Sequence, residues 1–303
     1  MADIKIEQTY IKPKTHEELA AIAQETIAIS NAGYYELNDT ITLLTDIKEV
    51  VVYSPENLKM LAETVNNMAF ITKDKNKTKY IVVNEDSFEA AKGYERPFVM
   101  NFANAHTPGG GFLSGSRAQE ESLCRNSNLY KSLTNEKAYE MYKYNMQHRE
   151  LNCYSDYMLL SKNVCVFRNA ENELLEEPYL VDVITIPAPN KKWEARNVEQ
   201  KELYYVMKSR LRHMFNVAIN NGNKTLVLGA WGCGAFGNST EDVAQIFFEL
   251  LCEENYEKHF NNIIFAIYND LQKLEIFKQT FKDKLNMQKK DITIINEVYD
   301  IIL

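Results

Sequence analysis

Two adjacent glutamates, Glu120 and Glu121, are the residues of this chain whose type and position could carry out chemistry. One carboxyl group can give a proton to a departing hydroxyl group and then take a proton from an incoming water, which is what hydrolysis of an acetal requires. Neighbouring residues cannot point the same way, so we expect different roles for the two side chains rather than the paired carboxylates of ordinary glycosidases. The simpler alternative is a solvent-exposed acidic pair at a helix start, stabilised by the helix dipole.

Glycines gather in two loops that could hold a ligand. The chain has 11 glycines, of which four lie between Gly109 and Gly115 and four between Gly229 and Gly237. Glycine allows positive φ and lets a ligand approach the backbone amides, so each cluster predicts a loop that surrounds a ligand. A flexible linker is the alternative, but apolar, strand-like segments flank both clusters.

The second glycine loop lies between the apolar segment 225–228 and a helix. A strand, a glycine loop and a helix in this order aim successive amides at a phosphate group. Glu241 and Asp242 already occupy the electropositive helix start, so phosphates should contact loop 232–237 instead. This loop also has the Gly-x-Gly-x-x-Gly spacing of dinucleotide-binding folds, but no acidic residue ends a following strand at the distance that a ribose-binding carboxylate needs.

The elements around these loops predict an α/β fold. From Tyr80 onward, strand-like and helix-like segments alternate, which is typical of a mostly parallel sheet covered by helices. A capping box at Thr15 predicts a first helix, and Asn38 with Asp39 predicts a hairpin turn. The other main expectations are strands at 49–53, 80–84, 97–101, 164–167, 179–186 and 263–267, helices at 54–68, 87–93 and 197–220, and one or two polar helices over 119–145.

The composition suits one large α/β domain or two small ones, with 303 residues, 45% hydrophobic and 25% charged. The net charge of −8 argues against a basic surface for nucleic acid and favours a small anionic ligand. The amino terminus lacks a hydrophobic signal region, and no apolar run approaches the ~18 residues of a membrane span. We therefore predict a cytoplasmic protein that binds neither a membrane nor a specific nucleic-acid sequence.

Metal and cofactor sites have no support in the sequence. The five cysteines are widely spread and lack the paired spacing of zinc sites or disulfides, and the histidines lack partner spacing. Cys233 could be reactive, although a small residue that fits a tight loop is the simpler explanation. Trp193 and Trp231 could stack on an adenine or fill the core. We predict reduced thiols, no metal and no cofactor.

The chain resembles the poly(ADP-ribose) glycohydrolases, and in particular the bacterial type. Their signature of three glycines, seven residues and Gln-Glu-Glu is matched by residues 109–111 and 119–121, and loop 232–238 is similar to the family's diphosphate loop. The resemblance extends from near Gly33 to Ile267. It implies a macrodomain-like three-layer α/β/α fold with a mixed, mostly parallel central sheet. Residues 1–75 would be an N-terminal extension packed on a catalytic core, residues 76–303.

The resemblance also implies a site for ADP-ribose between the two loops and hydrolysis of its ribose-to-ribose glycosidic bond. Glu121 would be the catalytic acid and base, and Glu120 would orient the ribose. The implied substrate contacts are Asn104 and Phe236 beside the distal ribose, the amides of Gly232, Cys233, Gly234, Ala235, Phe236 and Gly237 on the diphosphate, and Gly109, Gly110, Gly111 and Gln119. The implied partners are ADP-ribose, poly(ADP-ribose) or an ADP-ribosylated macromolecule.

Two other functions stay open at this point. A module that binds ADP-ribose without cleaving it is disfavoured by the intact Gln-Glu-Glu sequence at 119–121. A dinucleotide-dependent oxidoreductase is disfavoured by the missing ribose-binding carboxylate.

Overall fold

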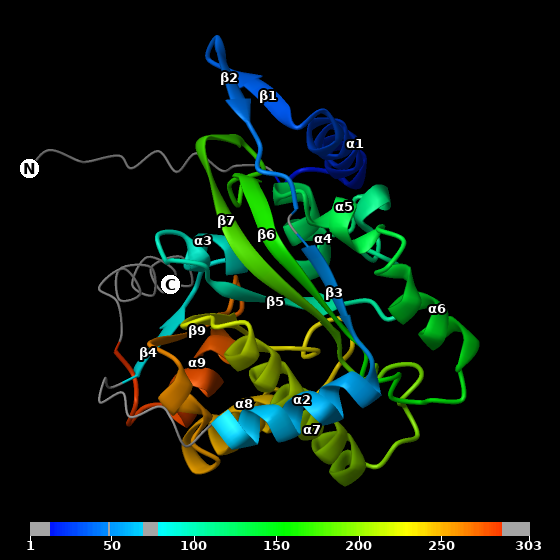
Figure 1. The fold of residues 1–303 in the computed structure, drawn as a ribbon, viewed down its shortest axis with the longest axis vertical. Coiled ribbons are helices and arrows are strands. Elements are labelled where there is room, and N and C mark those ends of the chain that lie inside the picture. The colour runs from blue at the N-terminus through cyan, green and yellow to red at the C-terminus, as the bar shows by residue number, and fades with distance from the viewer. Residues whose placement is uncertain (1–12, 48, 69–77, 287–303) are drawn as a thin grey trace, which may run out of the picture.

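A seven-stranded mixed sheet forms the centre of the protein (Figure 1). The structure is a computed structural model, and it describes residues 13–47, 49–68 and 78–286. The strands are β3 (Glu49–Tyr53), β4 (Lys79–Val83), β5 (Phe98–Ala103), β6 (Met158–Arg168), β7 (Leu174–Pro187), β8 (Thr225–Leu228) and β9 (Asn262–Ala266). Their order is β3-β6-β7-β5-β8-β9-β4. The pairs β3·β6 and β6·β7 are antiparallel and the other pairs are parallel, so the predicted mixed, mostly parallel sheet is confirmed.

Helices cover both faces of this sheet and bury two separate cores. On one face lie α2 (Pro55–Met68), α7 (Gln200–Asn220), α8 (Thr240–Phe248) and α9 (Leu271–Thr280), and on the other α3 (Ser87–Ala91), α4 (Gln119–Asn126), α5 (Leu129–Leu133) and α6 (Tyr139–Gln147). Strand β4 shows the alternation directly, because Tyr80 and Val82 belong to the first core and Ile81 and Val83 to the second. The predicted three-layer α/β/α architecture is therefore confirmed.

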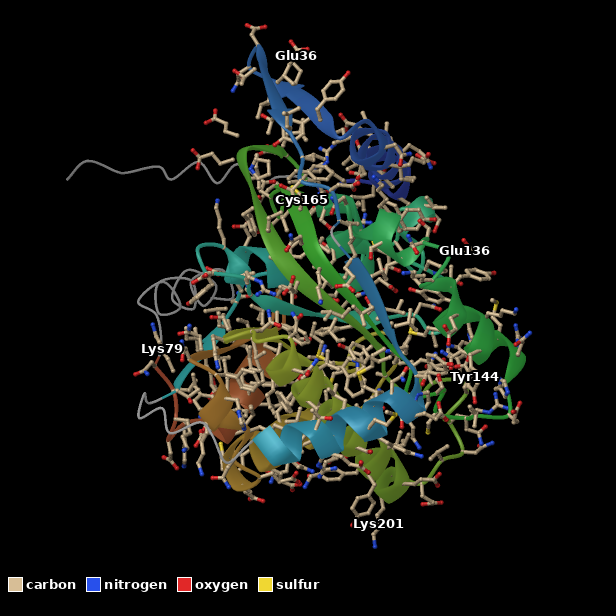
Figure 2. All side chains as sticks on the ribbon, in the orientation of Figure 1. Glu36, Lys79, Glu136, Tyr144, Cys165 and Lys201 are labelled. Atoms are coloured by element: carbon tan, nitrogen blue, oxygen red, sulfur yellow. The ribbon has the colours of Figure 1, made fainter. Side chains whose placement is uncertain are left out.

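The N-terminal region contributes both to the sheet and to a separate projection. Helix α1 (His16–Ala32) has the predicted capping box, in which the Glu18 amide donates to the Thr15 hydroxyl at 3.2 Å. Hairpin β1 (Tyr34–Leu37) and β2 (Thr40–Leu43) turns at Asn38 and Asp39, both with positive φ, and Figure 2 shows Glu36 on it, pointing into solvent. Strand β3 then joins the sheet edge. The division at residue 75 stays a prediction.

One prediction about the elements is wrong, and one helix was missed. The segment 119–145 forms the three short helices α4, α5 and α6 rather than one or two polar helices, because Ser127 and Asn128 hydrogen-bond to the backbone and break the helix between α4 and α5. Six of the eight residues of α4 are buried, although most are polar. Helix α9 follows β9 without having been predicted. The part of the N-terminal sequence used to predict location, residues 1–7, lies outside the described residues.

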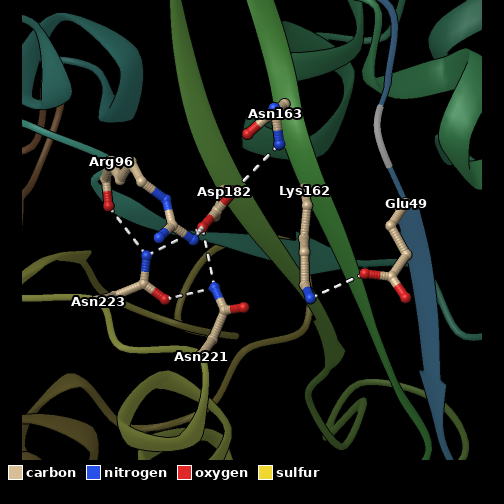
Figure 3. Close-up of polar contacts among 7 residues, drawn as sticks. All are labelled: Glu49, Arg96, Lys162, Asn163, Asp182, Asn221 and Asn223. Carbon is tan, nitrogen blue, oxygen red and sulfur yellow. Dashed lines mark hydrogen bonds and ion pairs between the residues drawn. The ribbon is translucent and has the colours of Figure 1, made fainter.

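A buried aspartate anchors the end of the sheet that lies away from the glycine loops. Asp182 of β7, paired with Phe98 at the start of β5, is 1% exposed. Its Oδ2 accepts hydrogen bonds from Arg96, Asn221 and Asn223 at 2.9 to 3.0 Å (Figure 3). These bonds join the α7–β8 turn to β7 and β5. The register of β5, which ends at the candidate site, is thereby fixed from its other end.

No helix among residues 13–47, 49–68 and 78–286 is long and apolar enough to cross a membrane.

Candidate active site

A cleft of about 1100 Å³ opens at the carboxyl ends of the parallel strands. Each of these strands delivers lining residues just at or after its end: Glu85 and Asp86 after β4, Ile267 after β9, Ala230 after β8, Asn104 after β5 and Ala188 after β7. Ligands of open α/β sheets bind at this edge. Of the predicted site residues, Asn104, Gln119, Glu120, Glu121, Gly232, Gly234, Ala235 and Phe236 line the cleft, whereas Gly109, Gly110, Gly111, Cys233 and Gly237 are not among the lining residues.

Glu120 lies in the first turn of α4 and is 3% exposed. Its Oε2 accepts a hydrogen bond from the Asn104 amide at 2.7 Å, and its Oε1 accepts one from Asn101 Nδ2 at 3.3 Å. Burial, with a smaller contribution from the charge of Glu121, raises the pKa of Glu120 to about 8. The side chain is therefore mostly uncharged at neutral pH, although it lines a cleft.

Glu121 is held differently from its neighbour. Its Oε1 accepts a hydrogen bond from the Gly111 amide at 2.8 Å, while its Oε2 is buried and has no hydrogen-bond partner within the described part of the chain. An unsatisfied buried carboxylate oxygen is costly, so its presence at a cleft wall indicates a position kept for a ligand group. The two carboxyl groups thus have different hydrogen-bond partners, and the different roles expected for them from the sequence stay a prediction.

The glycine triplet lies against these carboxyl groups. A Cβ on Gly110, whose φ is +55°, would lie 2.6 Å from Glu121 Oε1 and 3.1 Å from Glu120 Oε2. Glycine is needed at this position because the backbone approaches both side chains closely and with a positive φ. The triplet thus positions the two carboxyl groups, and its contact with substrate stays a prediction.

Arg125, which the sequence analysis did not single out, begins a chain of hydrogen bonds that ends on Glu121. Arg125 Nη1 donates to the Ser116 carbonyl at 2.6 Å, the Ser116 amide donates to the Gly111 carbonyl at 3.1 Å, and the Gly111 amide donates to Glu121. Arg125 is 3% exposed and follows Glu121 by four residues on α4. This spacing of four residues places both side chains on one helix face, and it is the feature of the sequence from which Arg125 could have been predicted as a site residue.

Gln119 fastens the start of α4 to β5. Its Oε1 accepts a hydrogen bond from the Phe102 amide at 2.9 Å, and its Nε2 donates to the Met100 carbonyl at 2.7 Å and to Ser87 Oγ at 3.0 Å. These bonds occupy both ends of the side-chain amide. Its observed role is to set the position of Glu120 and Glu121, and a contact with substrate stays a prediction.

Loop 229–238 offers free amides to the cleft. The amides of Cys233, Gly237 and Asn238 donate within the loop, to Ala230, Gly234 and Gly232 respectively. In contrast, the amides of residues 232, 234, 235 and 236 have no hydrogen-bond acceptor among the residues that the structure describes. Because the amides of Cys233 and Gly237 already donate within the loop, only these four of the six amides that we predicted to contact the diphosphate are available to it.

Cys233 and Trp231 serve the loop and the core. Cys233 is 8% exposed, and burial raises the pKa of its thiol to about 12, which makes it unreactive as a thiolate. Trp231 is fully buried, and its Nε1 donates to the Ile186 carbonyl at 2.9 Å. Of the two roles considered for each residue, the structural one is the one that the geometry favours.

A further part of the cleft wall was not foreseen. It comprises Tyr268, Asn269, Asp270 and Lys273 from the β9–α9 segment, next to Glu85 and Asp86. The Asn269 amide donates to Asn84 Oδ1 at 2.8 Å, which joins the ends of β4 and β9. Within the described ranges, no group of three or more His, Cys, Asp or Glu residues could hold a metal ion.

The raised pKa of Glu120 predicts a pH-dependent stability. The unfolded carboxyl has a pKa near 4.3, so between about pH 4.3 and 8 the folded state holds a proton that the unfolded chain has lost. The free energy of unfolding should therefore fall as pH rises through this window, by at most about 1.4 kcal/mol per pH unit, and level off above it. Glu120→Gln should flatten this slope, because it removes the group that titrates. The fold should tolerate the glutamine, because rotation of the Asn101 amide would let its unpartnered Oδ1 accept from the new NH2 group.

Urea unfolding of wild type and Glu120→Gln at pH 5, 7 and 9 tests this, with Glu63→Gln on an exposed face of α2 as the matched control. A slope between pH 5 and 7 that is equal in all three proteins would contradict the assignment of the raised pKa to Glu120.

Comparison with known proteins places this geometry in context. The family model of the microbial-type PARG catalytic domain matches residues 23–169. The crystal structure of poly(ADP-ribose) glycohydrolase (PARG) from Thermomonospora curvata is 33% identical and has a TM-score of 0.81, covering 88% of this chain and 100% of that chain. The same enzyme bound to the inhibitor ADP-HPD is 32% identical with a TM-score of 0.76 and the same coverage.

A second organism provides a complex with ADP-ribose. The PARG of Deinococcus radiodurans bound to ADP-ribose is 34% identical to this chain and has a TM-score of 0.69, covering 78% of this chain and 95% of that chain. A comparison with curated proteins found no match.

Proposed function

From the membership of this chain in the microbial-type poly(ADP-ribose) glycohydrolase family, we infer that it is a glycoside hydrolase, and we propose that it binds ADP-ribose in the cleft and hydrolyses the ribose-to-ribose bond of poly(ADP-ribose). The observation that carries the proposal is Glu121 Oε2, a buried carboxyl oxygen without a partner in the described part of the chain, at the wall of that cleft. ADP-ribosylated macromolecules are a second possible substrate class with the same bond type. The cytoplasmic location stays a prediction.

The proposed reaction needs one proton to be given and one to be removed. Glu121 protonates the oxygen of the departing ribose, the bond from that oxygen to the anomeric carbon breaks, and water adds to the carbon while its proton returns to Glu121. The chain of hydrogen bonds from Arg125 through Ser116 and Gly111 holds the other carboxyl oxygen still during both steps. Glu120, largely uncharged at neutral pH, adds no negative charge beside Glu121 once Glu121 has given up its proton, and it is free to orient a ribose hydroxyl.

The phosphates are proposed to bind at loop 229–238. The free amides of 232, 234, 235 and 236 supply donors for a diphosphate without a cationic side chain, which suits a protein of net charge −8. Phe236 and Asn104, which both line the cleft, would border the distal ribose between this loop and the glutamates. A substrate held at both ends places its glycosidic bond at Glu121.

The products identify the function. We expect wild-type protein, incubated with labelled poly(ADP-ribose), to release free ADP-ribose, and we would compare the rate with that on mono-ADP-ribosylated protein. Binding of ADP-ribose without cleavage of either linked substrate would show a binding module instead. Reduction of a nicotinamide dinucleotide, the property of the oxidoreductase alternative, is not expected.

A further inference from the structure

An exposed aromatic surface adjoins the cleft, and neither the cleft nor the core accounts for it. It consists of Asn152, Trp193, Glu194, Arg196 and Asn197, which enclose a shallow hollow of about 310 Å³. We call it the Trp193 surface. Trp193 is 67% exposed, whereas the other tryptophan of the chain is fully buried. Tryptophan combines a large apolar face with a polar N–H group, so an exposed one close to a cleft can bind the ring of a ligand.

Both loops of the candidate site contact residues that adjoin this surface, namely Lys192, which precedes Trp193, and Tyr154, which hydrogen-bonds to Glu194. The Lys192 amide donates to the Phe236 carbonyl at 3.2 Å, and the Lys192 side chain passes so close to Gly237 that a Cβ there would lie 2.9 Å from it. From the first loop, the ring of His106 packs edge-on against Tyr154, with centroids 5.2 Å apart. The Trp193 surface therefore borders the end of the cleft at which Asn104 and Phe236 lie.

A hydrogen bond fixes the acidic member of this surface. Tyr154 donates to Glu194 Oε2 at 2.7 Å, so this carboxylate is engaged by the tyrosine that also contacts His106. Arg196 and the neighbouring Lys192 are exposed, whereas Lys191 donates to the Val198 carbonyl at 2.6 Å. An exposed indole beside two exposed cationic side chains can bind an aromatic base and the phosphates attached to it.

We propose that the Trp193 surface is a second subsite, which binds the adenine and diphosphate of the ADP-ribose unit on the leaving side of the scissile bond. The inference rests on the proposed function, because only in a polymer does the bond at Glu121 lead to a further adenine-bearing unit. The distal ribose beside Asn104 and Phe236 carries that bond, so the leaving unit emerges at the end of the cleft that the Trp193 surface borders. The substrate class that this subsite selects is a chain of ADP-ribose units rather than a single unit on a protein.

The test compares a ligand that has a second adenine with one that does not. In a Glu121→Gln background, which should cleave the dimer too slowly to disturb a titration, binding of an ADP-ribose dimer should be tighter than binding of ADP-ribose. Trp193→Ala should weaken dimer binding by about 5- to 50-fold, the loss of one base-aromatic stack, and change ADP-ribose binding by less than about 2-fold. Trp193→Phe should restore most of the difference, and dimer binding should quench the fluorescence of Trp193.

Matched controls separate this subsite from general effects. Tyr34→Ala removes another exposed aromatic ring, on hairpin β1–β2, and should leave both affinities unchanged. In active protein, Trp193→Ala should raise the KM for polymer with kcat little changed. Equal dimer affinities with and without Trp193→Ala in the Glu121→Gln background, or an equal loss for dimer and monomer, would overturn the subsite while polymer cleavage by wild type still stood. Failure of wild type to cleave polymer would instead overturn the proposed function and the subsite with it.

Discussion

Glu121→Gln should lower the turnover of poly(ADP-ribose) by about 10² to 10⁴-fold, the usual contribution of a positioned acid and base. Glutamine keeps the size of the side chain and its oxygen can still accept from the Gly111 amide, but its amide cannot cycle a proton. ADP-ribose binding should change by no more than about 1.5 kcal/mol, one ordinary hydrogen bond. Steady-state assays beside calorimetric titration with ADP-ribose measure both quantities on one protein preparation.

Glu120→Gln is the matched variant, because it makes the same change one residue earlier. Glu120 accepts from Asn104 and Asn101 and lines the cleft, so its replacement should disturb the placement of the ribose, raising KM as well as lowering the rate. Wild-type turnover in Glu121→Gln would show that the catalytic assignment is wrong. A larger loss of kcat in Glu120→Gln than in Glu121→Gln would exchange the two roles.

The sheet could be predicted because its strands carry local signals. The apolar runs that became β4, β5, β8 and β9 are short, buried on both faces and bounded by polar or glycine-rich segments, as parallel strands are. The hairpin turn was readable from Asn38 and Asp39, which tolerate positive φ. In contrast, the order of the strands depends on pairings between distant segments, such as β3 with β6, and no local pattern contains it.

The candidate site was predictable in its residue types and less so in its contacts. The glycines were read as groups that surround a ligand, but Gly110 is required because the backbone there passes beside two carboxyl groups of the protein itself. Likewise Gln119 was expected to contact substrate, whereas its amide is occupied by Phe102, Met100 and Ser87, which come from other elements. A spacing motif records which residues are needed near a site and does not distinguish ligand contacts from supporting ones.

Two glycines of the second loop illustrate how the structure separates these roles. Gly232 has φ of +74°, and a Cβ there would lie 2.6 Å from both Ala188 Cβ and Asn238 Nδ2. Gly234 lacks positive φ, and a Cβ on it would meet no atom within 4 Å. Both line the cleft, so only the space around each glycine tells which is needed by the fold and which is needed by a ligand.

Gly234→Val should therefore abolish ADP-ribose binding, with affinity falling at least about 100-fold, while the free energy of unfolding stays within about 1 kcal/mol of wild type. The branched side chain would occupy the open space beside the free amides of 234 to 236, where the diphosphate is proposed to bind. Gly234→Ala adds a single methyl group and should weaken binding less. Calorimetry with ADP-ribose and thermal unfolding of the same samples measure the two effects.

Gly232→Val is the control variant. A valine side chain at position 232 has no space, and the backbone conformation there disfavours any residue with a Cβ. This variant should lower the melting temperature clearly, and any loss of binding would follow from damage to the loop. If Gly234→Val instead folds normally and binds ADP-ribose with unchanged affinity, the free amides of loop 229–238 do not hold the diphosphate. The glycines of that loop would then be structural, and the phosphates would have to bind elsewhere in the cleft.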